Sequence, residues 1–265
     1  MRDSFRVNFL IVGAQKSGTT ALASFLAQHP EICHSPRKEL HFFDSPEFDD
    51  TAPPTQIDAE YRRGFPNFSG ERLIGESTPI YMFRPQIAAR IQRYNPRMKL
   101  IAILREPAAR AISQYQMFVQ RGEESQSMLQ AFIREGIYSR LQNTRWRGKL
   151  RERSYLARGF YTQQIRNLLR HFDRRRILFL RNEDLMNDHE ATLQRIYEFL
   201  EVRDRSIVAP AAPVAVGDYR VGTPWLLPRA LRLFFAPEIR RLEKLLGWNL
   251  ISWRQPEGLR SGEAP

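Results

Sequence analysis

Residues 13–20 have the composition of a loop that binds phosphate groups. They read Gly13-Ala14-Gln15-Lys16-Ser17-Gly18-Thr19-Thr20 and stand between the apolar run 7–12 and a helix-like segment at 21–28. The start of a helix carries unpaired N–H groups and the positive end of its dipole, which attract anions. Gly13 and Gly18 let the backbone approach a ligand closely, and Lys16 supplies a point charge. We therefore predict a phosphate-binding loop.

The place of the lysine argues against the common type of ATP-binding loop. In that type the lysine directly follows the second glycine, whereas Lys16 precedes Gly18 by two residues. A glycine-rich turn can also join a strand to a helix without binding a ligand. The lysine and the two threonine hydroxyls that accompany the glycines favour the phosphate-binding interpretation.

Arg105 and Ser113 form a second candidate anion site. Arg105 directly follows the apolar run 100–104, and Ser113 comes eight residues later in a predicted helix. A guanidinium matches the geometry of a phosphate, and a serine hydroxyl adds a donor. The alternative is a structural ion pair of Arg105 with Glu76 or Glu106. Beside a phosphate loop we favour the anion site.

The segment 35–44 is a candidate for acid–base chemistry. It places four ionisable residues next to a pair of phenylalanines: Lys38, Glu39, His41 and Asp44. A carboxylate flanked by cations stays ionised, as a general base must. The alternative is an exposed Lys–Glu pair beside phenylalanines of the core, and the residues alone do not decide between the two.

Short apolar runs alternate with helix-like segments along the chain. The predicted strands lie at 9–12, 73–74, 100–104 and 177–180. The predicted helices lie at 19–28, 85–94, 107–121, 160–172, 188–200 and 236–246, with another within 126–135, and the predicted loops at 44–58 and 208–228. This alternation predicts a parallel sheet covered on both faces, with its ligand beyond the carboxyl ends of the strands.

Length and composition narrow the class of protein. The 265 residues are 42% hydrophobic, enough for one large core, so we predict a single domain over 1–254 and a disordered tail over 255–265. Apolar stretches do not reach the roughly 20 residues of a membrane span. We therefore expect a cytoplasmic protein. A single cysteine, Cys33, and five scattered histidines argue against disulfides and metal sites.

The net charge of +12 implies an affinity for polyanions, but charge does not choose among them. The densest basic region, 134–176, is more typical of a solvated helical face than of a nucleic-acid groove, because no recognised nucleic-acid module accompanies it. We expect no nucleic-acid partner.

Five motifs occur in a specific order. They are Gln15 to Leu22 (QKSGTTAL), His29-Pro30, Lys38 to Asp44 (KELHFFD), Glu76 to Tyr81 (ESTPIY) and Ile103 to Pro107 (ILREP), the last followed by Ser113 and Tyr115. In this order the chain resembles the PAPS-dependent sulfotransferases, specifically the heparan sulfate sulfotransferase-like branch and its bacterial small-molecule relatives. The resemblance is close over residues 7–120 and looser beyond them.

The resemblance implies a three-layer α/β fold of the P-loop-like type, with a central parallel sheet flanked by helices. It implies that the 5′-phosphosulfate of PAPS binds to Gln15, Lys16, Ser17, Gly18, Thr19 and Thr20, and the 3′-phosphate to Arg105 and Ser113. Glu39 would be the general base, His41 a supporting or acceptor-site residue, and Lys16 would stabilise charge on the leaving phosphate. Further nucleotide contacts are expected from Arg220 and Gly222.

The predicted reaction moves a sulfuryl group from PAPS to a hydroxyl, less readily an amine, of a small-molecule or glycan acceptor, and leaves PAP without the help of a metal. The loops 44–70 and 122–160 would choose the acceptor. Two alternatives remain at this point. One is a P-loop nucleoside or sugar kinase that uses ATP and Mg²⁺ at 181–184; the other is a non-catalytic polyanion-binding module that uses 134–176.

Overall fold

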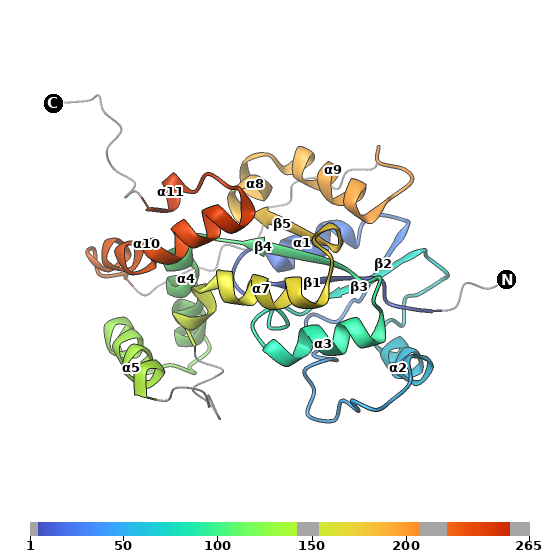
Figure 1. The fold of residues 1–265 in the computed structure, drawn as a ribbon, viewed down its shortest axis with the longest axis horizontal. Helices are drawn as coiled ribbons and strands as arrows, with labels where there is room; N and C mark the ends of the chain where they lie inside the picture. Colours follow the sequence, from blue (N-terminus) through green and yellow to red (C-terminus); the bar gives the residue numbers. More distant parts are fainter. Residues whose placement is uncertain (1–4, 142–153, 207–221, 255–265) are drawn as a thin grey trace. The chain divides into compact units, whose positions relative to one another are not determined.

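The computed structural model describes residues 5–141, 154–206 and 222–254 (Figure 1). The chain divides into two compact units. The first unit comprises residues 1–105 and 164–216, and the second comprises 106–163 and 217–265. The single domain predicted over 1–254 stays a prediction, and the predicted tail 255–265 lies outside the described residues.

The first unit is built on a parallel sheet. Its strands are β1 (Phe9–Gly13), β2 (Ile32–His34), β3 (Leu73–Ser77), β4 (Lys99–Leu104) and β5 (Ile177–Arg181). They lie in the order β2-β3-β1-β4-β5, and every neighbouring pair is parallel. The carboxyl ends of all five strands therefore meet at one edge, which we call the carboxyl edge. This confirms the predicted sheet and its α/β class.

Helices cover the sheet on both faces. One face packs against α1 (Thr19–Leu26), α8 (Asn182–Asn187) and α9 (His189–Leu200) through a buried cluster that includes Phe9, Ile11, Ile101, Ile103 and Leu193. On the other face Figure 1 shows α3 (Pro85–Tyr94) and α7 (Tyr161–His171), which are joined by a hydrogen bond from Asn167 Nδ2 to the carbonyl oxygen of Pro85, 2.9 Å long. Together these layers form the predicted three-layer sandwich.

A glycine at the centre of the sheet makes room for an aromatic ring. Gly75 of β3 pairs with Phe9 of β1, and a Cβ at position 75 would lie only 2.4 Å from the Phe9 ring. Since both residues are buried, a side chain larger than hydrogen cannot be placed there without displacing the Phe9 ring from its packed position.

The remaining helices of the first unit are α2 (Pro54–Tyr61) and the short 3₁₀ turns η1 (Arg62–Gly64) and η3 (Arg174–Arg176). The second unit contains α4 (Pro107–Gln120), α5 (Met128–Leu141), η2 (Ala157–Gly159), α10 (Leu227–Leu246) and α11 (Ile251–Arg254), and α7 begins within it. Among the described residues, none of these helices combines the length and the hydropathy that crossing a bilayer requires.

The structure differs from the predicted elements at four places. The strand β2 and the helix α8 are additional elements, and α2 lies partly inside the predicted loop 44–58. Helix α10 begins nine residues before the predicted start at 236 and continues through Pro237. The prolines of this segment are compatible with helix α2, because Pro54 stands in the first turn, where the N–H that proline lacks would have no partner within the helix.

Candidate functional site

The loop between β1 and α1 is tied to the sheet by its own backbone. The N–H of Ala14 donates to the carbonyl oxygen of Ile103 at 2.7 Å, and the N–H of Ser17 donates to the oxygen of Ala14 at 3.2 Å. Lys16 and Gly18 both have left-handed backbone conformations, with φ of 67° and 94°. The predicted residues Gln15 to Thr20 therefore form one compact turn that leads into the first turn of α1.

Residues at the ends of two other strands hold this turn in place. Asn182, directly after β5, donates from Nδ2 to the carbonyl oxygen of Ser17 at 3.0 Å. Arg105, directly after β4, donates from Nη1 to the carbonyl oxygen of Lys16 at 3.3 Å. A Cβ at Gly18 would lie 2.8 Å from Nδ2 of Asn182, so this position requires glycine for space as well as for its φ.

Ser17 provides the test of whether this turn fits an anion. Its hydroxyl oxygen is buried and has no hydrogen-bond partner within the residues that the structure describes. A buried hydroxyl without a partner is costly, and an oxygen of a phosphate group would accept from it. Together with the first-turn N–H groups of α1 and the Lys16 ammonium, this donor set suits a phosphate or phosphosulfate.

Arg105 and Ser113 fall into different units. Arg105 lies at the carboxyl edge of the first unit, and Ser113 is buried within α4 of the second. Both carboxylates considered as alternative partners of Arg105 accept hydrogen bonds from other groups. Glu106 caps α4 by accepting from the N–H groups of Ala108 and Ala109 at 2.9 and 2.7 Å, and Glu76 is bound by hydroxyls. A shared phosphate site of Arg105 and Ser113 stays a prediction.

Glu39, His41 and Asp44 form a connected charged cluster. Nε2 of His41 lies 3.3 Å from an oxygen of Glu39, and Nδ1 lies 3.0 Å from an oxygen of Asp44. Asp44 also pairs with the guanidinium of Arg84 at 2.9 Å. The carboxylates of Asp44 and Glu39 raise the pKa of the His41 imidazole to about 10. His41 therefore carries a positive charge at neutral pH, held between two carboxylates.

Backbone strain is concentrated on the predicted catalytic residues. Among the described residues, the non-glycine positions with left-handed φ are Lys16, Glu39, His41 and Glu201. Such conformations cost energy for residues with a Cβ, and proteins retain them mainly where the surroundings enforce a functional geometry. Three of these four positions are the ones predicted for catalysis.

A buried carboxyl group lies behind the cluster. Glu76 of β3 is fully buried and accepts hydrogen bonds from the hydroxyls of Tyr61 and Thr78 at 2.9 and 2.7 Å. The Thr78 hydroxyl in turn accepts from the backbone N–H of His41 at 3.3 Å. Burial raises the pKa of the Glu76 carboxyl to about 7, against the opposing effect of the Thr78 and Tyr61 hydroxyls. Glu76 thus connects the sheet to the His41 backbone.

The rule for carboxyl ends of parallel strands nominated Asn182 and Thr78 by position, because they directly follow β5 and β3, but the sequence assigned neither of them a positioning role. Sequence reasoning missed Tyr61 altogether. Tyr61 carried no comparable signal, because it ends α2, a helix that lies partly inside a predicted loop.

Of the two residues predicted to add nucleotide contacts, Arg220 lies outside the described residues. Gly222 is exposed, and a Cβ built on it would meet no atom within 4 Å. The described residues supply no neighbour that would fix a nucleotide contact there. The role of both residues stays a prediction.

The two alternative functions find little support in the contacts of their residues. The acidic residues of the kinase alternative are Glu183 and Asp184, and Asp184 accepts a two-pronged hydrogen bond from Arg181 at 2.6 and 3.0 Å, an ion pair that competes with a Mg²⁺ ion for its carboxylate. In the basic region, Arg134 pairs with Glu124, Arg175 pairs with Asp173, and Arg174 stacks over Phe179. Part of this region, 142–153, lies outside the described residues.

Comparison with known proteins places these features in a family. Residues 6–209 match the family described as "Sulfotransferase domain". A crystal structure of a sulfotransferase from Alicyclobacillus acidocaldarius is 31% identical, with a TM-score of 0.78 over 94% of this chain and 99% of that one. A mouse sulfotransferase crystallised with PAP has a TM-score of 0.51 over 88% of this chain and 85% of that one and, at 18% identity, shares the fold alone.

A curated relative supports the same assignment. Human heparan sulfate glucosamine 3-O-sulfotransferase 3B1 is 30% identical over 194 residues, which cover 73% of this chain and 46% of that protein. The match thus spans less than half the length of that relative. These comparisons confirm the predicted class of enzyme, and the chain belongs to the sulfotransferase domain family.

Proposed function

We propose that this protein transfers a sulfuryl group from PAPS to a hydroxyl, less readily an amine, of a small-molecule or glycan acceptor. The observation that carries the proposal is the left-handed backbone of Lys16, Glu39 and His41, which marks these three residues as held for function. In the reaction, the acceptor hydroxyl gains the sulfuryl group that bound PAPS supplies, PAP leaves, and the hydroxyl proton goes to the protein.

The phosphate loop binds and orients the nucleotide in this proposal. The donors are the Lys16 ammonium, the Ser17 hydroxyl and the first-turn N–H groups of α1, which include those of Thr19 and Thr20. Because they are fixed before the ligand arrives, they stabilise negative charge without reorganising. Arg105 can place its guanidinium on a second anionic group while its Nη1 supports the loop.

Glu39 is the residue that takes the acceptor proton. Its carboxylate lies 3.3 Å from the protonated imidazole of His41, and a neighbouring cation favours the ionised form that a base requires. His41 is a positioning residue in this scheme, since Asp44 and the Thr78 hydroxyl fix its ring and its backbone. Positioned acid–base groups typically contribute about 10²- to 10⁴-fold to a rate.

The experiment combines turnover with nucleotide binding. Wild-type protein is incubated with PAPS and a panel of hydroxyl and amine acceptors, and products that gain a sulfuryl group are detected by mass spectrometry. Glu39→Gln should abolish turnover and bind PAP with nearly unchanged affinity in calorimetry. Glu190→Gln, an exposed position on α9, is the matched control.

Three results would contradict the proposal. Turnover of Glu39→Gln at the wild-type rate would remove Glu39 as the base. Binding of ATP that depends on Mg²⁺, with no affinity for PAP, would favour the kinase. Binding of heparin with a steep salt dependence that Lys16→Ala leaves unchanged, and no affinity for PAP, would favour the polyanion-binding module.

We further propose that the protein acts in the cytoplasm, which cell fractionation tests.

A further inference from the structure

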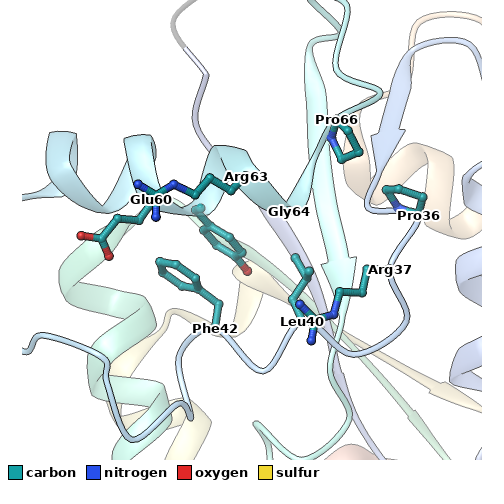
Figure 2. Close-up of a pocket in the computed structure, with 9 residues that line it drawn as sticks. Pro36, Arg37, Leu40, Phe42, Glu60, Arg63, Gly64 and Pro66 are labelled. Atoms are coloured by element: carbon teal, nitrogen blue, oxygen red, sulfur yellow. The ribbon is translucent and has the colours of Figure 1, made fainter.

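A pocket opens beside the segment that carries Glu39 and His41. It has a volume of about 390 Å³ and is lined by residues of 36–42 on one side and of α2, η1 and the following turn on the other (Figure 2). The volume lies at the lower end of the range of about 300–1,000 Å³ that is typical of small-molecule sites. All of its lining residues belong to the first unit.

The wall of the pocket and the catalytic cluster share one stretch of backbone. Leu40 and Phe42 line the pocket, and they alternate with Glu39 and His41. Neighbouring Cα atoms are about 3.8 Å apart, so a molecule in contact with the Leu40 side chain lies within roughly 10 Å of the Glu39 backbone. The pocket is therefore close enough to hold the part of an acceptor that surrounds its reacting hydroxyl.

The apolar wall is preformed. The ring of Phe42 stacks on that of Tyr61, with centroids 4.0 Å apart and planes inclined by 6°, and Tyr61 is fixed by its hydrogen bond to Glu76. Leu40 packs directly over Gly64, where a Cβ would lie 2.8 Å from Cδ1 of Leu40. These contacts create a flat, rigid surface for an apolar or aromatic group.

The charged part of the lining favours an anion. Arg37 and Arg63 stand on opposite sides of the pocket, and within the described residues neither guanidinium has an ion pair or a hydrogen bond (Figure 2). Arg62, by contrast, donates to the carbonyl oxygens of Phe65 and Phe68 and is a structural residue. Glu60, the carboxylate of the lining, accepts from Gln56 at 3.2 Å. Two guanidiniums thus outnumber one carboxylate.

We propose that this pocket binds the acceptor, and that the acceptor is a compact hydroxylated molecule with an apolar or aromatic body and an anionic group. The body lies against Leu40 and Phe42, and the anionic group pairs with Arg37 and Arg63. This inference rests on the proposed function and specifies its substrate class. A pocket of this size holds one small molecule rather than several units of a long glycan chain.

The experiment compares three probes that share a phenol ring and differ in charge. They are 3-(4-hydroxyphenyl)propanoate, its neutral amide, and the cation tyramine. Binding to the full chain is measured by calorimetry with and without PAP, and sulfation is measured with PAPS. We expect the acid to bind at least about tenfold more tightly than the amide and tyramine to bind most weakly, because one or two charge-assisted hydrogen bonds are lost in turn.

Variants separate charge from shape. Arg37→Ala combined with Arg63→Ala should bring the preference for the acid over the amide close to one. The matched control Arg166→Ala, on the exposed side of α7, should retain the preference. Gly64→Ala forces Leu40 to move, so it should weaken the acid and the amide equally and leave their ratio unchanged.

The outcomes distinguish the two proposals. Equal binding of the acid and the amide to wild type, or a preference that survives in the double arginine variant, overturns the pocket assignment even if other acceptors are sulfated. Loss of the preference in the double variant supports the pocket. If that loss occurs in a protein that does not bind PAP and sulfates no acceptor, the proposed function fails and with it the acceptor role of the pocket, and only an anion-selective binding pocket remains.

Discussion

Replacing Glu76 by glutamine should remove a pH dependence from the stability of the first unit. Burial raises the pKa of this carboxyl from its ordinary value of 4.5 to about 7. The folded state therefore holds the proton more tightly than the unfolded state. The stabilisation from this proton is fully present below pH 4.5 and is lost as the pH rises to about 7.

The size of the effect follows from the same pKa. One pKa unit corresponds to 1.36 kcal/mol, so the free energy of unfolding of the wild type should fall by roughly 3 kcal/mol between pH 4.5 and pH 8 because of this group. Glu76 is fully buried, so solvent does not screen the effect. The glutamine variant should lose this slope, whatever its absolute stability, since its amide does not titrate.

The assay is urea unfolding by far-ultraviolet circular dichroism at a series of pH values. Tryptophan fluorescence serves as an internal control, because the four tryptophans, at 146, 225, 248 and 253, all fall in the second unit. Thr78→Val removes a hydroxyl that opposes the pKa rise and should move the pH window upward. Parallel pH profiles for wild type and Glu76→Gln would refute the reasoning.

Three further changes test separate contacts. Arg105→Ala should weaken PAP binding by roughly 1.5 to 3 kcal/mol, about 10- to 150-fold in calorimetry, and an unchanged affinity would remove Arg105 from the nucleotide site. Gly75→Ala should lower the free energy of unfolding by roughly 1 to 3 kcal/mol in urea unfolding, since its Cβ would lie 2.4 Å from the Phe9 ring. Wild-type stability of this variant would show that the Phe9 ring moves aside without cost. Asp44→Asn should lower the pKa of His41 from about 10 in an NMR titration, because Asp44 is the main cause of its rise, and a value that stays near 10 would contradict that cause.

The sheet and most helices could be predicted because their signals are local. Apolar runs in the sequence correctly predicted four of the five strands, and the predicted helix 85–94 matches α3 residue for residue. The strand β2 escaped because it is three residues long and contains Cys33 and His34, too short for any periodic pattern. Its place at the edge of the sheet depends on pairing with β3, whose paired residues lie 41 positions later in the sequence, as Leu73 does from Ile32.

The candidate site could be predicted in its residue types but not in its geometry. Lys16, Glu39 and His41 stood out as cations and a carboxylate beside glycines and aromatics. Their left-handed backbone could not be foreseen, since it is enforced by distant contacts such as the hydrogen bonds from Asn182 to the phosphate loop and from His41 to Thr78. Long-range contacts of this kind leave no pattern in the local sequence.

Glu76 connects the two parts of the proposed acceptor site. One of its hydroxyl partners, Tyr61, stacks on the pocket residue Phe42, and the other, Thr78, accepts from the backbone of His41. Hydrogen bonds to an ionised carboxylate are about twice as strong as those between neutral groups. Ionisation of Glu76 near pH 7 therefore tightens both connections while it lowers the stability of the fold. In the pH range where Glu76 is ionised, the hydrogen bonds of the site are therefore stronger and the fold is less stable. This is a trade-off between function and stability at one buried group.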